Sequence, residues 1–309
     1  MIRYILIKIF ICYAFIASAS ENTVFVVKSA DHPALDVVAS AIYDTIKGIA
    51  SVSVKSAQGN IVLAHQIASQ CFASHPKAVV GIGTMAAQML LSARKKHDTL
   101  VVFSSVTEPY KAGLLKNENV AGVSNFLPSE RYLAIMIEMQ PYIKKLGILY
   151  NPSEINSQYI VNDLSKACSK YNIKLVKRAL LKVTDVNSCL ASIIEKVDAI
   201  VISNDNTALS GISNIAEFCK KRKIPLYCTD VDTVYAGVLG AIGPNQYKIG
   251  VMTGELLKKA FNHEKVDSTV LYPEKVEIAI NKVTSDEIGF SIPRSIMEKA
   301  SVIVNDLQK

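Results

Sequence analysis

Short runs of β-branched and apolar residues alternate with longer stretches of helical period along the whole chain. In the first half the apolar runs lie at residues 24–27, 51–54, 78–82 and 99–103. The alternation restarts after residue 125, and the apolar runs of the second half lie at residues 146–150, 173–180, 198–203 and 224–228. Strands that are apolar throughout, each followed by a helix, form parallel sheets covered on both faces. The pattern therefore predicts two doubly wound α/β domains.

The end of the chain does not fit a simple division into two halves. A helical stretch at 247–261, an alternating run at 276–281 and a last segment at 291–304 remain after the second series of strands. We expect the chain to cross back between the domains, which makes their connection a multi-crossing hinge. The expected boundaries are 21–124 with about 244–266 for the N-terminal lobe, and 125–243 with about 267–309 for the C-terminal lobe.

The N-terminus has the layout of a secretory signal peptide. Arg3 and Lys8 precede and flank an apolar run, and small residues follow at Ala17 and Ala19. The run is shorter than the roughly 20 residues that a spanning helix needs, which disfavours a membrane anchor, the alternative interpretation. We expect residues 1–20 to be a signal peptide and the mature protein to be exported to a periplasmic or other extracytoplasmic location.

Composition and charge exclude some function classes. The 309 residues carry a formal net charge of +7, but Lys and Arg are spread along the chain and aromatic residues make up only 7%, which argues against nucleic acid as the main partner. The mature chain keeps an odd number of cysteines, with neither C-x-x-C nor zinc-finger spacing. We interpret them as core residues, with one or two disulfides as the alternative. These cysteines are Cys71, Cys168, Cys189, Cys219 and Cys228.

Polar loops follow most of the predicted strands. In open parallel sheets ligands bind beyond the carboxyl ends of the strands, so function is expected in these loops. The loops rich in hydroxyl, amide and acid groups lie at 29–36, 81–88, 104–109, 150–158, 203–210 and 228–233. Two domains that present such loops to each other predict a cleft that closes on a small polar molecule.

Four of the polar loop residues have a purely structural alternative. Thr84, Ser153, Thr207 and Asp230 each stand just ahead of a helical pattern, where Ser, Thr and Asp are ordinary N-caps. Capping and ligand contact are compatible, because a helix N-terminus offers free N–H groups and a positive dipole end to an anion. The sequence leaves both roles open.

The sequence offers little for catalysis. Of the histidines only His32 lies in a candidate loop, where Asp31 and Asp36 accompany it, but the step into Pro33 also simply opens a helix. The chain lacks G-x-S-x-G, H-E-x-x-H and G-x-G-x-x-G motifs, so we expect neither an enzyme nor a bound cofactor or metal. The competing interpretation is a secreted α/β hydrolase or isomerase that uses His32 and an acid in the same cleft.

Eight segments resemble, in order and spacing, the ABC-transporter substrate-binding proteins of the tryptophan/tyrosine type. They are DHPALD, SAQGN, GIGTMAAQ, VVFSSVTEPYKAGLL, NVAGVS, LGILYNPSEINS, AIVISNDNT and AGVLGAIGPNQYKIGVMTGELL. The resemblance covers about residues 24–304. It implies a fold like that of type I periplasmic binding proteins, an amino-acid ligand with aromatic preference, closure by hinge motion, and delivery by a monomer to an ABC permease in the membrane.

The resemblance also implies a set of ligand contacts. These are Thr84, Ser104, Thr107, Glu108, Ser153, Asn156, Asp205, Asn206, Thr207 and Asp230. An α-ammonium group needs a carboxylate, which Glu108, Asp205 or Asp230 would supply, and an α-carboxylate needs donors, which Thr84, Ser104 or helix N-termini would supply. The six loops contain no Arg, so a bidentate Arg clamp is not expected.

Two features of the sequence concern the ligand assignment. Glu108 stands where the family usually has Asp, one methylene shorter. The chain has no Trp, so aromatic stacking would have to come from Tyr or Phe. The candidates, which are equally good core or surface residues, are Tyr110, Phe126, Tyr159 and Tyr247.

Overall fold

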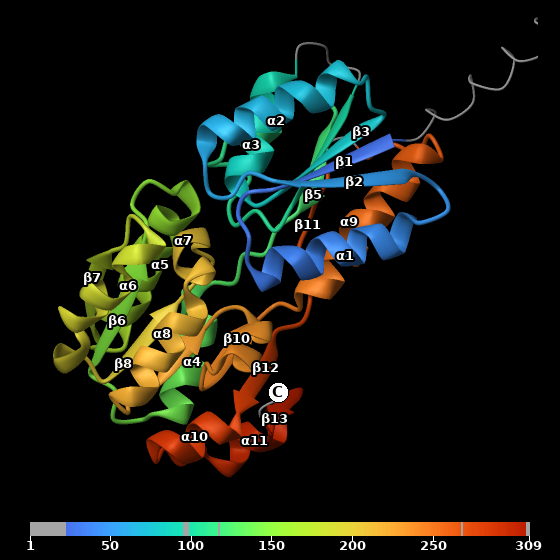
Figure 1. Cartoon of the computed structure of the whole chain (residues 1–309). Helices are drawn as coiled ribbons and strands as arrows, with labels where there is room; N and C mark the ends of the chain where they lie inside the picture. The colour runs from blue at the N-terminus through green and yellow to red at the C-terminus, as the bar shows by residue number, and fades with distance from the viewer. Residues whose placement is uncertain (1–22, 95–98, 117, 267, 307–309) are drawn as a thin grey trace, which may run out of the picture.

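The chain folds into two α/β lobes that lie side by side with their strand ends facing each other (Figure 1). This computed structural model describes residues 23–94, 99–116, 118–266 and 268–306. The predicted signal peptide lies outside the described residues. None of the helices within those ranges has the length and apolar character to cross a membrane.

The first lobe is a six-stranded sheet in the order β11-β5-β4-β3-β1-β2, with helices on both faces. Helices α1 and α9 pack on one face, and α2 and α3 pack on the other. Its elements are β1 (Thr23–Lys28), α1 (Pro33–Ile46), β2 (Ser51–Ser56), α2 (Ile61–Ala73), β3 (Ala78–Ile82), α3 (Thr84–Ala93), β4 (Leu100–Ser104), η1 (Leu114–Lys116), β5 (Val120–Val123), α9 (Gln246–Phe261) and β11 (Val270–Leu271).

The second lobe is a seven-stranded sheet in the order β13-β12-β10-β9-β8-β6-β7. Helices α4 and α5 pack on one face, and α6 and α8 on the other. Its elements are α4 (Ser129–Met139), β6 (Lys145–Tyr150), α5 (Ile155–Lys170), β7 (Lys174–Ala179), η2 (Val183–Asp185), α6 (Val186–Ala191), η3 (Ile194–Lys196), β8 (Ala199–Ile202), α7 (Asn206–Ser210), α8 (Ile212–Lys221), β9 (Leu226–Cys228), η4 (Val231–Ala236), β10 (Gly240–Gly243), β12 (Glu277–Asn281), α10 (Lys282–Ile288), α11 (Arg294–Lys299) and β13 (Val302–Val304).

Parallel pairing dominates both sheets, as the apolar runs predict. All described pairs are parallel except β10 with β12. Strands β3, β5 and β8 are buried at every position, because helices cover both of their faces. The five cysteines are free and buried, which confirms their interpretation as core residues.

The chain crosses between the lobes after β5, after β10 and after β11. Helix α9 returns to the first lobe and packs against α1, where Gly250 allows a close approach: a Cβ at this position would lie 2.5 Å from the Cβ of Ala41. The sequence placed residues from about 267 onward in the second domain, but β11 pairs with β5 in the first sheet. This two-residue strand has too little pattern to be recognised before its partner is known.

Candidate functional site

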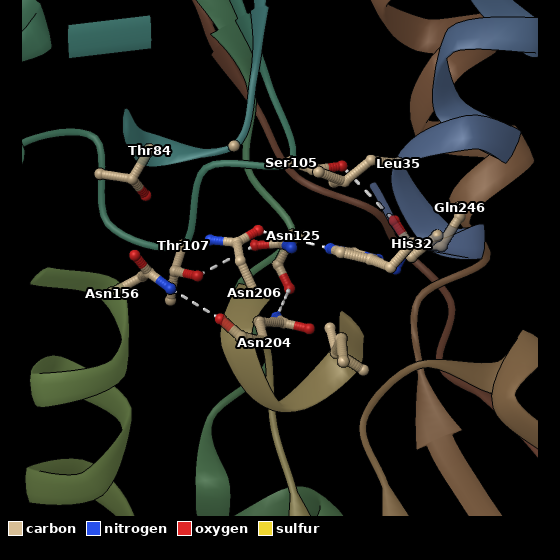
Figure 2. Close-up of a pocket in the computed structure, with 13 residues that line it drawn as sticks. His32, Leu35, Thr84, Ser105, Thr107, Asn125, Asn156, Asn204, Asn206 and Gln246 are labelled. Atoms are coloured by element: carbon tan, nitrogen blue, oxygen red, sulfur yellow. Dashed lines mark hydrogen bonds between the residues drawn. The ribbon is translucent and has the colours of Figure 1, made fainter. Parts of the chain in front are cut away.

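A small polar pocket lies between the two lobes, where their loops meet (Figure 2). We call it the deep pocket. Its volume is about 20 Å³, so in this lobe arrangement it holds about one water-sized group. Four asparagines line it, Asn125 from the first crossing and Asn156, Asn204 and Asn206 from the second lobe. Their amides offer both donors and acceptors to whatever occupies the pocket.

A larger chamber, the outer pocket, opens next to the deep pocket. Thr84, Asn156 and Asn206 line both, so the two spaces are adjacent. The outer pocket has a volume of about 550 Å³, within the range of small-molecule sites. Both lobes contribute apolar side chains to its wall: Ile61 and Met85 from the first lobe, and Ile155, Leu181 and Val183 from the second.

The start of helix α3 brings Thr84 into the site. Gly83 precedes it with φ of +85°, a conformation that favours glycine. Ser29 Oγ accepts the backbone N–H of Ala86 at 3.0 Å and so serves the N-terminus of α3 from a neighbouring loop. Thr84 is therefore the first helical residue and not the N-cap, and it is buried against the pockets.

Replacing Gly83 by Ala is expected to destabilise the protein by about 2–4 kcal/mol, because a positive φ is strained for Ala and the new methyl group would meet a buried neighbour. A Cβ at Gly83 would lie 2.6 Å from Ser29 Oγ. Gly113→Ala is the matched control, since Gly113 has φ of +75° with open space around it. Urea denaturation of both variants separates the cost of the strained backbone, which both share, from the cost of the contact with Ser29, which only Gly83→Ala has. Equal losses would show that contact with Ser29 contributes nothing.

Asp205 joins the loops of the second lobe. Its carboxylate caps α7 by accepting the N–H of Ala208 at 2.8 Å, and it also accepts the N–H of Asn151 at 2.5 Å and the hydroxyl of Ser157 at 2.7 Å. Burial, with the nearby charge of Glu154, raises the pKa of Asp205 above its usual value, against the effect of these donors. Asp205 lines neither pocket, so its place in the structure is that of a clamp beneath the site.

Glu154, which the sequence did not single out, aligns helices α5 and α7. Its carboxylate accepts four hydrogen bonds from the start of α7: from Asn206 N and Nδ2 at 3.0 and 2.6 Å, and from Thr207 N and Oγ1 at 3.1 and 2.8 Å. Thr207 and Ser153 are therefore not N-caps, because Asp205 and Glu154 occupy those positions. Ser153 and Thr207 both line the outer pocket.

Three further predicted contacts lie away from both pockets. Ser104 is buried with its Oγ 2.7 Å from Thr253 Oγ1, which ties β4 to α9. Asp230 is buried and caps η4 through the N–H of Asp232 at 3.2 Å. Glu108 is partly buried but lines neither pocket. The structure thus brings together at the pockets six of the ten predicted residues: Thr84, Thr107, Ser153, Asn156, Asn206 and Thr207.

The deep pocket carries no formal charge. Its only titratable lining residue is His32, and burial lowers the pKa of this imidazole to about 4, so it is neutral at pH 7. The carboxylates of the outer pocket are already engaged: Glu154 by the start of α7, and Asp31 by Lys28 at 2.9 Å. In the deep pocket a ligand head group would therefore meet neutral dipoles, whereas the outer pocket is also lined by the exposed Lys182.

A model of the family described as ABC transporter substrate binding protein matches residues 23–304. The chain belongs to this family. The resemblance in the eight segments is thereby confirmed.

Individual relatives of this substrate-binding protein are consistent with the family. The chain is 27% identical over 280 residues to a tyrosine-binding protein of Clostridioides difficile, covering 86% of this chain and 81% of the relative. A solved structure from Streptococcus pneumoniae, described as an ABC domain in complex with L-Trp, aligns with TM-score 0.86 and 27% identity over 92% of this chain and 100% of its own. The two-lobed fold of the type I periplasmic binding proteins is confirmed.

A second solved structure is described as ligand-free, in contrast to the L-Trp complex. It is a substrate-binding protein with adhesive properties from Clostridium difficile, described as ligand-free and open. It aligns with TM-score 0.68 and 26% identity, again over 92% of this chain and 100% of its own.

The substrate-binding protein has pocket residues that were not among the predicted contacts. Ser105, Asn125, Asn204 and Gln246 all line the deep pocket. Ser105 and Asn204 are next to predicted contacts in sequence, and Gln246 directly precedes a predicted helix. The sequence therefore indicates the loops that form the pocket but not which of their residues line it. Asn125 lies at the boundary between the two predicted halves, outside the six polar loops, so the sequence pattern does not indicate a place in the site.

The enzyme alternative finds no support in the geometry of the substrate-binding protein. The His32 imidazole lies 3.4 Å through Nε2 from the amide oxygen of Asn206. Asp31 and Asp36, the candidate acids, both pair with Lys28. Among the described residues, therefore, no carboxylate is hydrogen-bonded to this histidine to form the His–acid pair that general-base catalysis would use.

The aromatic candidates do not line either pocket of the substrate-binding protein within its described residues. Tyr110 and Tyr247 are exposed, and Phe126 packs edge-to-face on Tyr159 with ring centroids 5.4 Å apart. A large ligand side chain in the outer pocket would meet aliphatic and Met side chains instead.

Proposed function

We propose that the protein captures an amino acid with an aromatic or large apolar side chain between its lobes and releases it to an ABC permease. The observation that carries the proposal is that the two pockets adjoin and share Thr84, Asn156 and Asn206 as lining residues. The small, polar, uncharged pocket has room for one end of the amino-acid head group, such as its ammonium, and the adjoining chamber with aliphatic walls has room for the rest of the ligand and suits an apolar side chain. The relatives described as binding tyrosine and L-Trp support the same ligand class.

The head group would be bound largely by neutral groups. Of the three carboxylates expected to meet an α-ammonium, none lines a pocket, and Asp205 and Asp230 are engaged as caps. We propose that amide oxygens, such as that of Asn156, meet the ammonium, while Thr84 and the free N–H groups at the start of α3 meet the carboxylate. Each charged end of the zwitterion then has hydrogen-bonding partners of its own, which offset the cost of removing it from water.

In this proposal, the arrangement of the lobes in this protein is the closed one that it adopts around a bound ligand. The chain aligns with the L-Trp complex at TM-score 0.86 but with the ligand-free, open structure at only 0.68, although identity and coverage are nearly the same. A change in the angle between lobes lowers a whole-chain alignment without changing either lobe. Closure over the ligand by hinge motion at the three crossings is therefore part of the proposed mechanism.

Delivery to a permease would take place outside the cytoplasm. The signal-peptide pattern of residues 1–20 supports export, and the family model supports a role with an ABC transporter. The remaining expectation, that the protein acts as a monomer, belongs to the same proposal.

Isothermal titration calorimetry tests the ligand class. The protein is first unfolded and refolded to remove bound ligand, and is then titrated with each of the twenty amino acids and with D-glucose. We expect saturable binding of L-tyrosine, L-tryptophan or another amino acid with a large apolar side chain, and no binding of D-glucose. Absence of heat with every amino acid would overturn the proposal, as would binding of the sugar alone.

A further inference from the structure

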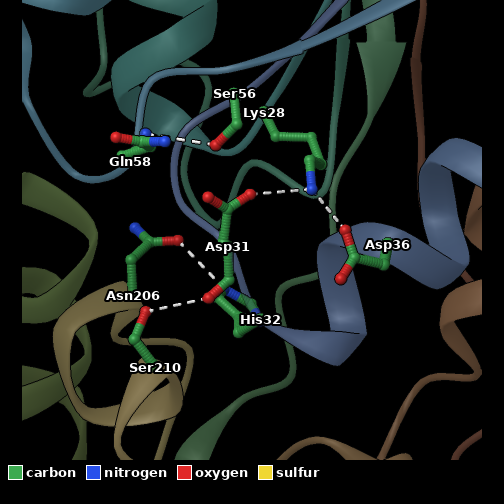
Figure 3. A network of polar contacts seen from close by, with 8 residues as sticks. All are labelled: Lys28, Asp31, His32, Asp36, Ser56, Gln58, Asn206 and Ser210. Carbon is green, nitrogen blue, oxygen red and sulfur yellow. Dashed lines mark hydrogen bonds and ion pairs between the residues drawn. The ribbon is translucent and has the colours of Figure 1, made fainter.

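The loop between β1 and α1 contacts helix α7 of the other lobe at two points (Figure 3). His32 Nε2 lies 3.4 Å from Asn206 Oδ1, a long hydrogen bond between residues 174 positions apart. The hydroxyl of Ser210 donates to the backbone oxygen of Asp31 at 3.3 Å. Both contacts cross the cleft, so they exist only while the lobes are closed.

The hydrogen-bond network determines which group donates across the cleft. Asn206 Nδ2 donates to Glu154 at 2.6 Å, which leaves the amide oxygen facing His32. An oxygen can only accept, so the proton of the neutral imidazole belongs on Nε2. His32 Nδ1 then carries a lone pair, and this buried atom has no hydrogen-bond partner among the described residues.

An ion-pair cluster in the first lobe holds His32 in place. Lys28, at the end of β1, has a side chain only 11% exposed, and it pairs with Asp31 at 2.9 Å and with Asp36. Although burial lowers the pKa of Lys28, its bonds to Asp36 and Asp31 raise it overall, so the cluster stays charged. Because Asp31 and Asp36 lie on either side of His32 in sequence, the cluster fixes the loop without contact with the second lobe.

We infer that His32 is a latch residue that stabilises the closed state through Asn206, and that Lys28 is its positioning residue. The inference rests on the proposed function, since it concerns how the cleft stays closed over its ligand. A bond made only after closure slows ligand escape and has little influence on ligand entry. The latch therefore acts on the dissociation rate constant.

Stopped-flow kinetics with L-tyrosine and L-tryptophan as probes test the latch. His32→Ala is expected to raise the dissociation rate constant about fivefold and to change the association rate constant less than twofold. His32→Gln, which places an N–H donor where Nε2 lies, is expected to restore most of the loss. His32→Asn, whose amide reaches only the position of Nδ1, is the matched control that does not.

A double-mutant cycle separates the latch from direct ligand contact by His32. If His32 and Asn206 act through each other, His32→Ala raises the dissociation rate constant only slightly when Asn206→Ala is already present. The increase in the double variant is then about fivefold smaller than the product of the increases in the two single variants. Lys28→Met is likewise expected to raise the dissociation rate constant in the wild type and to have little effect in the His32→Ala background. Multiplicative effects would overturn the inference.

Thiol cross-linking tests the latch even if no amino acid binds. Ile61→Cys and Leu181→Cys, made together, place exposed thiols on walls of the outer pocket that belong to different lobes, and both leave the Lys28 cluster and Ser210 intact. The rate of cross-linking by a short bismaleimide follows the closed population. His32→Ala in this background is expected to slow cross-linking about fivefold. An unchanged rate would overturn the latch, whereas calorimetry with wild-type protein decides the proposed function separately.

Discussion

Replacing Asp205 by Ala is expected to lower the free energy of unfolding by about 3–5 kcal/mol and to abolish ligand binding. The buried carboxylate accepts the N–H groups of Asn151 and Ala208 and the hydroxyl of Ser157. Removing it leaves buried donors without partners and frees the loops that carry Asn156 and Asn206 to the deep pocket. Urea denaturation at pH 7 and calorimetry with the amino acid that the wild type binds measure the two effects.

Two comparisons make this expectation specific. Asp306→Ala removes an exposed carboxylate of the same lobe and should leave stability and binding within error of the wild type. Asp205→Asn keeps one acceptor oxygen and should fall between the wild type and Asp205→Ala. If Asp205→Ala were to lose less than about 1 kcal/mol, the carboxylate would not be the clamp that the hydrogen bonds indicate.

Asp230→Asn is expected to gain stability relative to the wild type as the pH rises. Burial raises the pKa of Asp230 from 3.8 to about 7, with a smaller contribution from the charge of Asp232. Since the folded state holds this proton more tightly than the unfolded state, the contribution of Asp230 to wild-type stability is greatest below pH 4 and is lost as the pH rises through about 7. Asn cannot ionise but can still accept the N–H of Asp232. The advantage of the variant should therefore grow by about 2–4 kcal/mol between pH 4 and pH 8.

Urea denaturation of both proteins at pH 4, 6 and 8 checks this prediction. Titration of other groups, including His32 at acid pH, affects wild type and variant alike and cancels in the difference. Asp286→Asn, a replacement at an exposed position, is the matched control and should give a nearly constant offset. A constant offset for Asp230→Asn as well would contradict a buried carboxyl group that gains its charge near neutral pH.

The parallel sheets could be predicted because several of their central strands are apolar at every position. The runs around β3 and β8, buried throughout, stand out from their polar loops without any knowledge of the partner strands. Strands β10 and β11 lacked such a signal. Gly240–Gly243 contains two glycines and Val270–Leu271 has two residues, so each becomes a strand through its neighbours alone.

The candidate site could be placed at the strand ends, but individual roles could not be assigned from sequence. A polar residue before a helix can cap it, face a ligand or bind another loop, and the choice depends on where the helix begins. Thr84 lines the pockets as the first residue of α3, because Gly83, one residue earlier, is the N-cap. Asp205 turns inward as a cap and Asn206 faces the cleft, although they are neighbours. Glu154 acquires its importance from donors more than fifty residues away.

The return of α9 to the first lobe has a consequence for the order of folding. Ile249, Leu256, Leu257 and Phe261 of this helix complete the apolar layer that α1 begins more than two hundred residues earlier. The second lobe likewise gains β12 and β13 only at the end of the chain. The core of the second lobe comes mainly from residues before 245, whereas one face of the first sheet stays uncovered until α9 has been synthesised. The lobe that begins the chain is therefore expected to complete its packing after most of the lobe that follows it.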